Sequence, residues 1–320
     1  MEHRKAPIVC VSDGHAGNRR QAEALARALG HPEAPHLTLA PTRMARAFAP
    51  RLFPGDSRAL GEGFQQLLSK PPMLAIGCGR QAALATRLLR VAGSRVVQIL
   101  DPRLDPGHWD AVVAPSHDAL SGANVVTLEG SLHPVDDLWL AQARHAFPRI
   151  GALPGPRVAL LLGGPGRHWP MRDAALVEAL SALATRVREA GGSLLATASR
   201  RTPARWLDAL AALEPAMLWR DPRDGYNPYP GFLGWADAIV CSADSVNMLS
   251  EAAATHAPAW VIGRGALRGR PRHFLDALVA SERIRDLEDG SLASPLVPAM
   301  PIRESMRVAR ELRTLLGLET

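Results

Sequence analysis

Short apolar runs alternate with segments of helical periodicity from one end of the chain to the other. The runs have the length of buried strands, and apolar residues spaced three and four apart between them indicate helices. Strands that alternate with helices build parallel sheets, so the pattern predicts an α/β protein. The predicted strands are residues 7–12, 37–39, 73–77, 95–100, 111–114, 124–128, 157–162, 193–197, 217–219, 238–242 and 259–262.

A stretch rich in glycine and proline separates two such sets of strands and helices. We predict two Rossmann-like domains, residues 1–150 and 151–302, joined by a linker near residues 148–156. Two α/β domains that face each other form a cleft in which ligands bind. Residues 303–320 contain a last helix that we expect to pack across the domain junction. Its predicted apolar face consists of Met306, Ala309, Leu312, Leu315 and Leu316.

The charge of the chain is positive and carried almost entirely by arginine. Its 320 residues include 37 Lys and Arg against 31 Asp and Glu, for a net charge of +6. Guanidinium groups suit phosphate because they donate two parallel hydrogen bonds, although an arginine bias can also reflect genome composition. The arginines are spread along the chain and only 5% of residues are aromatic, so we expect no nucleic-acid partner.

The apolar segments of the chain indicate where in the cell the protein is expected to lie. No run is long enough to cross a bilayer, and the first residues lack the apolar stretch of a signal peptide, so we expect a cytoplasmic protein. Residues 43–53 mix three arginines with Met44, Phe48, Leu52 and Phe53. This mixture is typical of a segment at a membrane surface, here the inner face, and ordinary packing of a helix and a loop is the alternative.

A glycine-rich loop follows the predicted strand 157–162 and contains Gly163, Gly164, Gly166 and Arg167. Glycines let a backbone approach an anion, and N–H groups at a following helix start can donate to it. The loop matches neither the dinucleotide-binding fingerprint nor the Walker sequence. It is a candidate phosphate site, and a plain strand-to-helix turn is the alternative.

A second candidate loop holds Ser199, Arg200, Arg201 and Thr202, directly before Pro203. Proline is common at the first position of a helix, and a helix N-terminus favours an anion. A capped helix with solvated arginines is the alternative.

A third candidate loop follows strand 238–242, where Ser245, Asn247 and Glu251 lie in the first turns of a predicted helix. Ser and Asn side chains can bond a phosphate or a base edge, and a carboxylate can accept from both hydroxyls of a ribose. We expect Glu251, like Arg200, to face solvent in the cleft. Helix capping alone is the alternative. Because parallel strands end at one edge of a sheet, we expect all three loops to form one site.

Asp13 and His15 lie in a glycine turn after the first strand, and either could be the base that deprotonates an acceptor hydroxyl. A turn or cap role is the alternative. The sequence has no Asp-x-Asp pair for a nucleotide-bound metal ion and no Cys–His zinc spacing. We therefore predict no metal and no cofactor, with arginines and helix N-termini compensating the charge of a diphosphate.

Several segments occur together in a characteristic order: SDGHAGNRRQ, GCGRQA, QILDPR, LLLGGPGRHW, TASRRTP and CSADSVNMLSEA. Over about residues 8–265 they resemble bacterial members of the mitochondrial-fission (elongated-mitochondria) family. The resemblance implies a GT-B-like fold and glycosyltransferase activity. It further implies that Gly163–Gly166 and Ser199–Thr202 take the diphosphate, that Ser245 and Asn247 assist, and that Glu251 holds the ribose. The base would lie in the N-terminal domain, as Asp13 or His15 does.

Together these features predict a metal-independent glycosyltransferase that uses a nucleoside-diphosphate sugar. The sequence does not identify the acceptor, and lipid-linked molecules are among the candidates. An epimerase acting on the same donor is one alternative. A non-catalytic adaptor that binds a nucleotide sugar or a partner is another. An arginine pair at a helix start favours ligand binding over a purely structural role, because packing does not require it.

Overall fold

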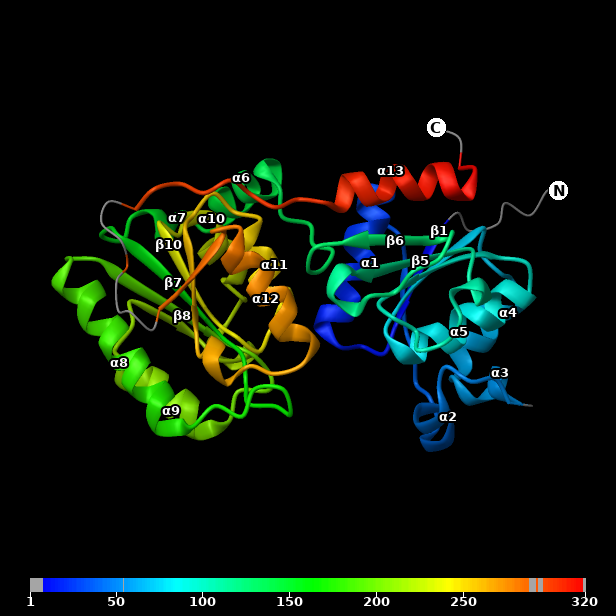
Figure 1. Cartoon of the computed structure of the whole chain (residues 1–320), viewed down its shortest axis with the longest axis horizontal. Helices are drawn as coiled ribbons and strands as arrows, with labels where there is room; N and C mark the ends of the chain where they lie inside the picture. Colours follow the sequence, from blue (N-terminus) through cyan, green and yellow to red (C-terminus); the bar gives the residue numbers. More distant parts are fainter. Residues whose placement is uncertain (1–7, 54, 288–291, 293–295, 319–320) are drawn as a thin grey trace. The chain divides into compact units, whose positions relative to one another are not determined.

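Two compact units make up the chain in the computed structural model, which describes residues 8–53, 55–287, 292 and 296–318 (Figure 1). The first unit is Met1–Pro134 together with Glu304–Thr320, and the second is Val135–Arg303. Each contains a parallel sheet of six strands, which confirms the prediction of two Rossmann-like α/β domains. Within the described ranges, no helix is both long and apolar enough to cross a membrane.

The first sheet has the strand order β2-β1-β3-β4-β5-β6. The chain passes from β1 to β2 on one side and then crosses to β3 on the other side of β1. The direction of the connections therefore reverses between β1 and β3, which is where ligands bind in open α/β sheets. The strands are β1 (Ile8–Ser12), β2 (His36–Thr38), β3 (Leu74–Cys78), β4 (Arg95–Ile99), β5 (Ala111–Pro115) and β6 (Val125–Leu128).

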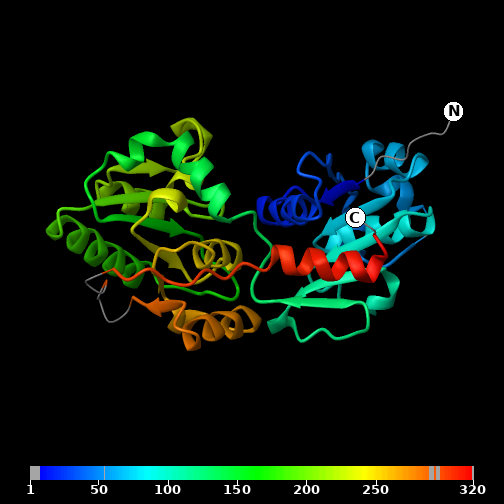
Figure 2. The ribbon, with the colours of Figure 1, turned by 90° about the horizontal axis from the view of Figure 1, so that it is seen from above.

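Alternate side chains of this sheet build a core on each of its faces. On one face Cys10 and Ile76 belong to a cluster with α1 (Ala16–Ala28) and α13 (Ser305–Leu316). Figure 2 shows α13 lying along the first unit. On the other face Val11 packs with residues of α4 and α5. The other α-helices described in this unit are α2 (Arg43–Phe48), α3 (Asp56–Ala59), α4 (Glu62–Ser69) and α5 (Arg80–Val91).

The second sheet has the order β12-β11-β10-β7-β8-β9, so its connections reverse between β7 and β10. One continuous core fills this unit around five fully buried tryptophan and phenylalanine side chains, Trp169, Trp206, Trp260, Phe232 and Phe274. The strands are β7 (Arg157–Leu162), β8 (Ser193–Ala198), β9 (Met217–Trp219), β10 (Ala238–Ser242), β11 (Ala259–Ile262) and β12 (Ile284–Asp286). The helices are α6 (Asp137–Ala146), α7 (Pro148–Gly151), α8 (Asp173–Glu189), α9 (Ala204–Ala212), α10 (Tyr229–Trp235), α11 (Val246–Ala253) and α12 (Arg270–Ala280).

The division between the units falls before α6, ahead of the segment 148–156 that we predicted as the linker. Helix α6 packs on α10: the Trp235 indole donates to the Arg144 carbonyl at 3.2 Å, and the Arg144 guanidinium donates to the Gly234 carbonyl at 3.2 Å. The glycine- and proline-rich segment instead leads into β7 inside the second unit.

Helix α13 packs on the first unit, and its buried face differs in part from the predicted one. Ala309, Leu312 and Leu316 are buried as expected, and Val308 joins them. Met306 and Leu315 are 61% and 41% exposed, so their assignment to the packing face was wrong. At 100° per residue they lie at the two edges of the buried stripe.

A partly buried ion pair joins the starts of β7 and β10. Asp237 accepts hydrogen bonds from the Arg157 backbone N–H at 2.7 Å and from the guanidinium at 2.9 and 3.1 Å. Burial raises the pKa of Asp237, but the hydrogen bonds and charge of Arg157 outweigh it and hold that pKa below its ordinary value.

Asp237→Asn is therefore expected to destabilise the protein by about 1–3 kcal/mol at neutral pH. Because the pKa of the folded state is lowered, the unfolded state binds more protons in this range, and the stabilisation is present above about pH 4. It is lost as the pH falls through the lowered pKa. Urea unfolding of both proteins at pH 7 and pH 3 measures this, and a difference that is equal at the two pH values would contradict it.

Candidate functional site

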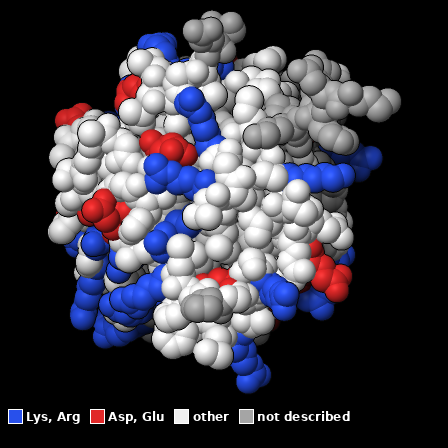
Figure 3. All heavy atoms as spheres, turned by 90° about the vertical axis from the view of Figure 1, so that its right-hand side faces the viewer, with Lys and Arg blue, Asp and Glu red and all other residues white. Residues whose placement is uncertain are grey.

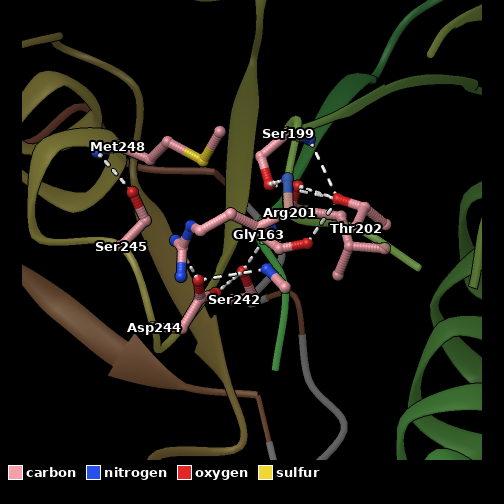
Figure 4. Close-up of polar contacts among 10 residues, drawn as sticks. Gly163, Ser199, Arg201, Thr202, Ser242, Asp244, Ser245 and Met248 are labelled. Carbon is pink, nitrogen blue, oxygen red and sulfur yellow. Dashed lines mark hydrogen bonds and ion pairs between the residues drawn. The ribbon is translucent and has the colours of Figure 1, made fainter. Parts of the chain in front are cut away.

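The carboxyl ends of β7 and β10 meet at the reversal point of the second sheet, and polar contacts join them there (Figure 4). The Gly163 N–H donates to Ser242 Oγ at 2.7 Å, and the Gly164 N–H donates to Asp244 Oδ2 at 3.1 Å. Both glycines are needed for this approach. A Cβ at Gly163 would lie 2.1 Å from Asp244 Oδ1, and one at Gly164 would lie 2.3 Å from the carbonyl oxygen of Arg201.

Asp244 is the central acceptor of this group, a role that sequence reasoning missed. Its carboxylate accepts from the Ser242 hydroxyl at 2.6 Å and from the Arg201 guanidinium at 2.5 Å. The Asp244 side chain is 3% exposed and that of Arg201 is 54% exposed, so the ion pair has a buried end and a solvated end. Ser245 caps α11 instead, accepting from the Met248 N–H at 3.4 Å.

A tight turn after β8 completes the cluster. Thr202 Oγ1 accepts from the Ser199 N–H at 3.0 Å and donates to the Gly163 carbonyl at 2.5 Å. The Ser199 hydroxyl accepts from the Arg201 N–H at 3.2 Å. The structure therefore places the Gly163–Gly164 loop and the Ser199–Thr202 turn beside each other at one edge of the sheet. Many of their hydrogen-bond donors already donate to acceptors within the protein.

The other residues proposed for this site lie in three different settings. Gly166 and Arg167 are exposed in a turn that closes on Trp169, where two backbone hydrogen bonds join Gly166 and Trp169. Arg200 is exposed beside Arg201. Asn247 lies in the first turn of α11 and is half-buried.

Glu251 lies one turn further along α11, and its surroundings differ from what we expected. The residue is only 4% exposed, and the Tyr229 hydroxyl donates to its Oε2. A solvent-facing Glu251 was therefore a wrong expectation. Tyr229, at the start of α10, is buried as well and fixes the orientation of this carboxylate.

Asp13 and His15 lie at the reversal point of the first sheet, after β1. His15 Nδ1 is 3.0 Å from Asp13 Oδ1, and the same oxygen accepts from the His15 N–H at 3.1 Å and from the Asn18 amide at 3.0 Å. Asn18 in turn packs on Gly79 after β3, where a Cβ would lie 2.5 Å from the amide nitrogen. The Asp13 side chain is 12% exposed and that of His15 is 76% exposed, so the carboxylate is fixed and the ring is accessible.

The three cysteines are buried, and burial raises the pKa of the Cys10 thiol to about 12. These thiols are protonated and belong to the cores of the two units. Among the residues that the structure describes, no three or more His, Cys, Asp or Glu side chains are grouped so that they could hold a metal ion.

Gly164→Ala is expected to destabilise the protein by about 1–3 kcal/mol, because its Cβ would meet backbone atoms that cannot move independently. Gly166→Ala is the matched control: its Cβ would meet nothing within 4 Å, so a change within about 0.5 kcal/mol is expected. Thermal unfolding of the two variants decides the matter, and equal melting temperatures would contradict the close approach of the loop.

Comparison with known sequences identifies relatives along most of the chain. A family model described as Mitochondrial fission ELM1 matches residues 16–316. The Mitochondrial fission protein ELM1 of Arabidopsis thaliana is 28% identical over 277 residues, which are 76% of this chain and 63% of that protein. The chain thus matches less than two thirds of that relative. The uncharacterized protein RP120 of Rickettsia prowazekii is 21% identical, with 97% of this chain and 99% of that protein covered.

Solved structures similar to this chain share its fold. UDP-GlcNAc 2-epimerase from Methanocaldococcus jannaschii has a TM-score of 0.53 at 14% identity, covering 97% of this chain and 99% of that one. The epimerase of the same name from Neisseria meningitidis has a TM-score of 0.53 at 13% identity, with coverages of 97% and 100%. The spinosyn forosaminyltransferase SpnP has 0.51 at 13% identity, with coverages of 99% and 96%. These likenesses confirm the GT-B-like fold. Because the family model matches nearly the whole chain, this protein belongs to the mitochondrial fission ELM1 family.

Proposed function

We propose that this protein is a glycosyltransferase that uses a nucleoside-diphosphate sugar, with the donor on the second unit and the base on the first. The observation that carries the proposal is the group of loops at the β7–β10 reversal point. Glycines, hydroxyl groups and an arginine pair follow the carboxyl ends of β7, β8 and β10 there and are joined by hydrogen bonds. Ligands bind at this point in open α/β sheets. The GT-B-like fold supports the reaction class by analogy alone.

In this proposal the diphosphate lies beside the first turn of α11, a helix of eight residues whose N-terminus attracts negative charge. Arg200 supplies a solvated guanidinium, and Arg201 contributes from the position that Asp244 fixes. Gly163 and Gly164 act through the close approach of their loop, since their N–H groups donate to Ser242 and Asp244.

Glu251 would accept the ribose hydroxyls in the same complex. It follows Asn247 by four residues on α11, so the two side chains lie on the same face of the helix. Tyr229 holds the carboxylate in one orientation through its hydroxyl. A carboxylate fixed in this way loses little conformational entropy when a ligand binds.

His15 would act as the base and Asp13 as its positioning residue. With Nδ1 bonded to Asp13, the His15 ring presents Nε2 as its proton acceptor. Nε2 takes the proton of an acceptor hydroxyl as the hydroxyl oxygen forms a bond to the anomeric carbon. The bond from that carbon to the diphosphate oxygen breaks, and the leaving diphosphate takes the electron pair, whose charge the arginines and the α11 N-terminus compensate.

A thermal-shift screen with nucleoside diphosphates and their sugars, in EDTA and in Mg²⁺, tests the proposal. A ligand at about 100 times its Kd adds about 2.7 kcal/mol, which moves the melting temperature by several degrees. We expect a shift with one nucleotide in EDTA that its sugar enlarges. No shift with any nucleotide would overturn the proposal in favour of a partner-binding adaptor. Interconversion of the bound sugar without an acceptor would identify an epimerase instead.

A further inference from the structure

Helix α2 in the first unit exposes its two large apolar side chains, whereas its buried residue is the small Ala45. Ala45 and Ala49 are 4% exposed, whereas Met44 and Phe48 are 72% and 45% exposed. A surface helix normally turns its larger apolar residues toward the core. Ala45 and Ala49 pack into the core of the first unit, whereas Met44 and Phe48 keep much of their apolar surface exposed.

The segment after α2 extends this exposed apolar surface. Leu52 and Phe53 are 39% and 48% exposed, and the rings of Phe48 and Phe53 meet edge to face with 5.4 Å between centroids. We call Met44, Phe48, Leu52 and Phe53 the α2 patch. Its four members lie within ten residues of one another in the sequence, and two of them are joined by the ring contact between Phe48 and Phe53. A cluster of this kind marks an interaction surface.

Helix α5 anchors the backbone beneath the α2 patch. The Arg80 guanidinium donates to the Arg46 carbonyl at 2.9 Å, and the Arg87 guanidinium donates to the Pro50 carbonyl at 2.7 Å. Thr42 caps α2 by accepting from the Ala45 N–H at 3.3 Å. The patch is thus presented by a segment tied to the unit at both ends.

The charges around the α2 patch are positive. Arg43, Arg46 and Arg51 are exposed, and no ion pair between their side chains and the described residues is present. Asp56 is 8% exposed, and its carboxylate accepts from the Phe53 N–H at 2.6 Å, so it points inward. Figure 3 shows that basic side chains prevail over acidic ones on the face of the first unit that it displays.

We propose that the α2 patch binds the surface of a bilayer that contains anionic lipids. The apolar side chains would enter the boundary between head groups and acyl chains, and the three arginines would lie among anionic head groups, the arrangement of an interfacial helix. Exposed arginines in the same segment as exposed aromatic side chains fit this surface by charge and by polarity. The proposal concerns a different surface from the nucleotide site and stands independently of the glycosyltransferase proposal.

Flotation of the full chain with vesicles tests the α2 patch. We expect binding to vesicles of phosphatidylcholine with phosphatidylglycerol, weak binding to phosphatidylcholine alone, and release by high salt. F48S/F53S should weaken binding to the anionic vesicles at least about tenfold, because apolar area no longer enters the lipid. R43S/R46S/R51S should weaken it about 100-fold, which is about a factor of five per arginine.

Matched controls change the same kinds of residue elsewhere on the surface. V91S/M306S removes two apolar side chains that are 84% and 61% exposed in the same unit, and R149S/R188S/R310S removes three exposed arginines. Both are expected to bind as the unchanged protein does, with melting temperatures of all variants within a few degrees. The proposal is overturned if the full chain does not float, if it binds neutral and anionic vesicles equally, or if the controls weaken binding as much as the patch variants.

Discussion

His15→Ala is expected to lower the rate of sugar transfer by about 10²- to 10⁴-fold and to leave donor affinity unchanged. The loss follows from removing the group that takes the acceptor proton, while the donor binds residues of the second unit in our proposal. The His15 side chain is 76% exposed, so its removal should change the free energy of unfolding by less than about 0.5 kcal/mol. Release of nucleoside diphosphate from the donor found in the thermal-shift screen gives the rate, and calorimetry gives the affinity.

Asp13→Ala separates a positioning role from a catalytic one. Without the carboxylate, His15 Nδ1 and the Asn18 amide lose their shared acceptor, so the ring is no longer held in one tautomer and orientation. We expect a smaller loss of turnover than for His15→Ala, again with unchanged donor affinity. His31→Ala, a change of a half-buried histidine after α1, is the control. If His15→Ala retains the full rate with an accepted donor, His15 is not the base.

Strand positions were predictable from sequence because buried parallel strands are continuous apolar runs. Every predicted strand is present within one or two residues of its expected ends. β12 was missed because Ile284 is the only apolar residue among its three positions, and an edge strand needs little apolar surface. α10 was missed because its sequence contains a proline and two glycines, and its contacts with α6 and the core stabilise it against a low helix propensity.

The sequence also predicted which loops lie close together at the sheet edge, but not which side chains form hydrogen bonds with one another there. Strand ends meet at one sheet edge in any parallel sheet, so the proximity of Gly163 to the Ser199–Thr202 turn followed from the strand pattern. Which side chain accepts from which donor depends on tertiary geometry. Asp244 could equally have capped α11, and only the approach of the β7 loop and Arg201 to its carboxylate shows its actual role. An acidic residue two positions after the end of β10, together with an arginine pair after β8, was the available signal.

The burial of Glu251 was not predicted for the same reason, because it too depends on tertiary geometry. Its position on α11 was evident from the spacing, but the facing element was not, because α10 was not predicted. The Tyr229 hydroxyl on α10 donates a hydrogen bond to one oxygen of the carboxylate. A helix position therefore predicts which residues share a face, whereas the exposure of that face depends on the neighbouring element.

Arg200→Ala is expected to weaken binding of the nucleoside diphosphate about 10- to 100-fold without loss of stability. A hydrogen bond between charged groups contributes about 1.5–3 kcal/mol, and each 1.4 kcal/mol is tenfold in affinity. Arg200 is exposed, and none of the hydrogen bonds or ion pairs found among the described residues involves its side chain. Its removal therefore takes away a cation without breaking a contact of the fold. Calorimetric titration with the nucleoside diphosphate measures the loss.

Arg201→Ala provides the comparison, because this neighbouring arginine is already bound to Asp244. Its removal leaves a carboxylate that is 3% exposed without its counter-ion, which should destabilise the protein as well as weaken nucleotide binding. R201A/D244N removes the charge of both partners and should recover much of the stability but not the affinity. Arg188→Ala, on the exposed side of α8, controls for a general change in surface charge. If Arg200→Ala and Arg188→Ala bind the nucleotide equally well, the diphosphate does not lie at the Ser199–Thr202 turn.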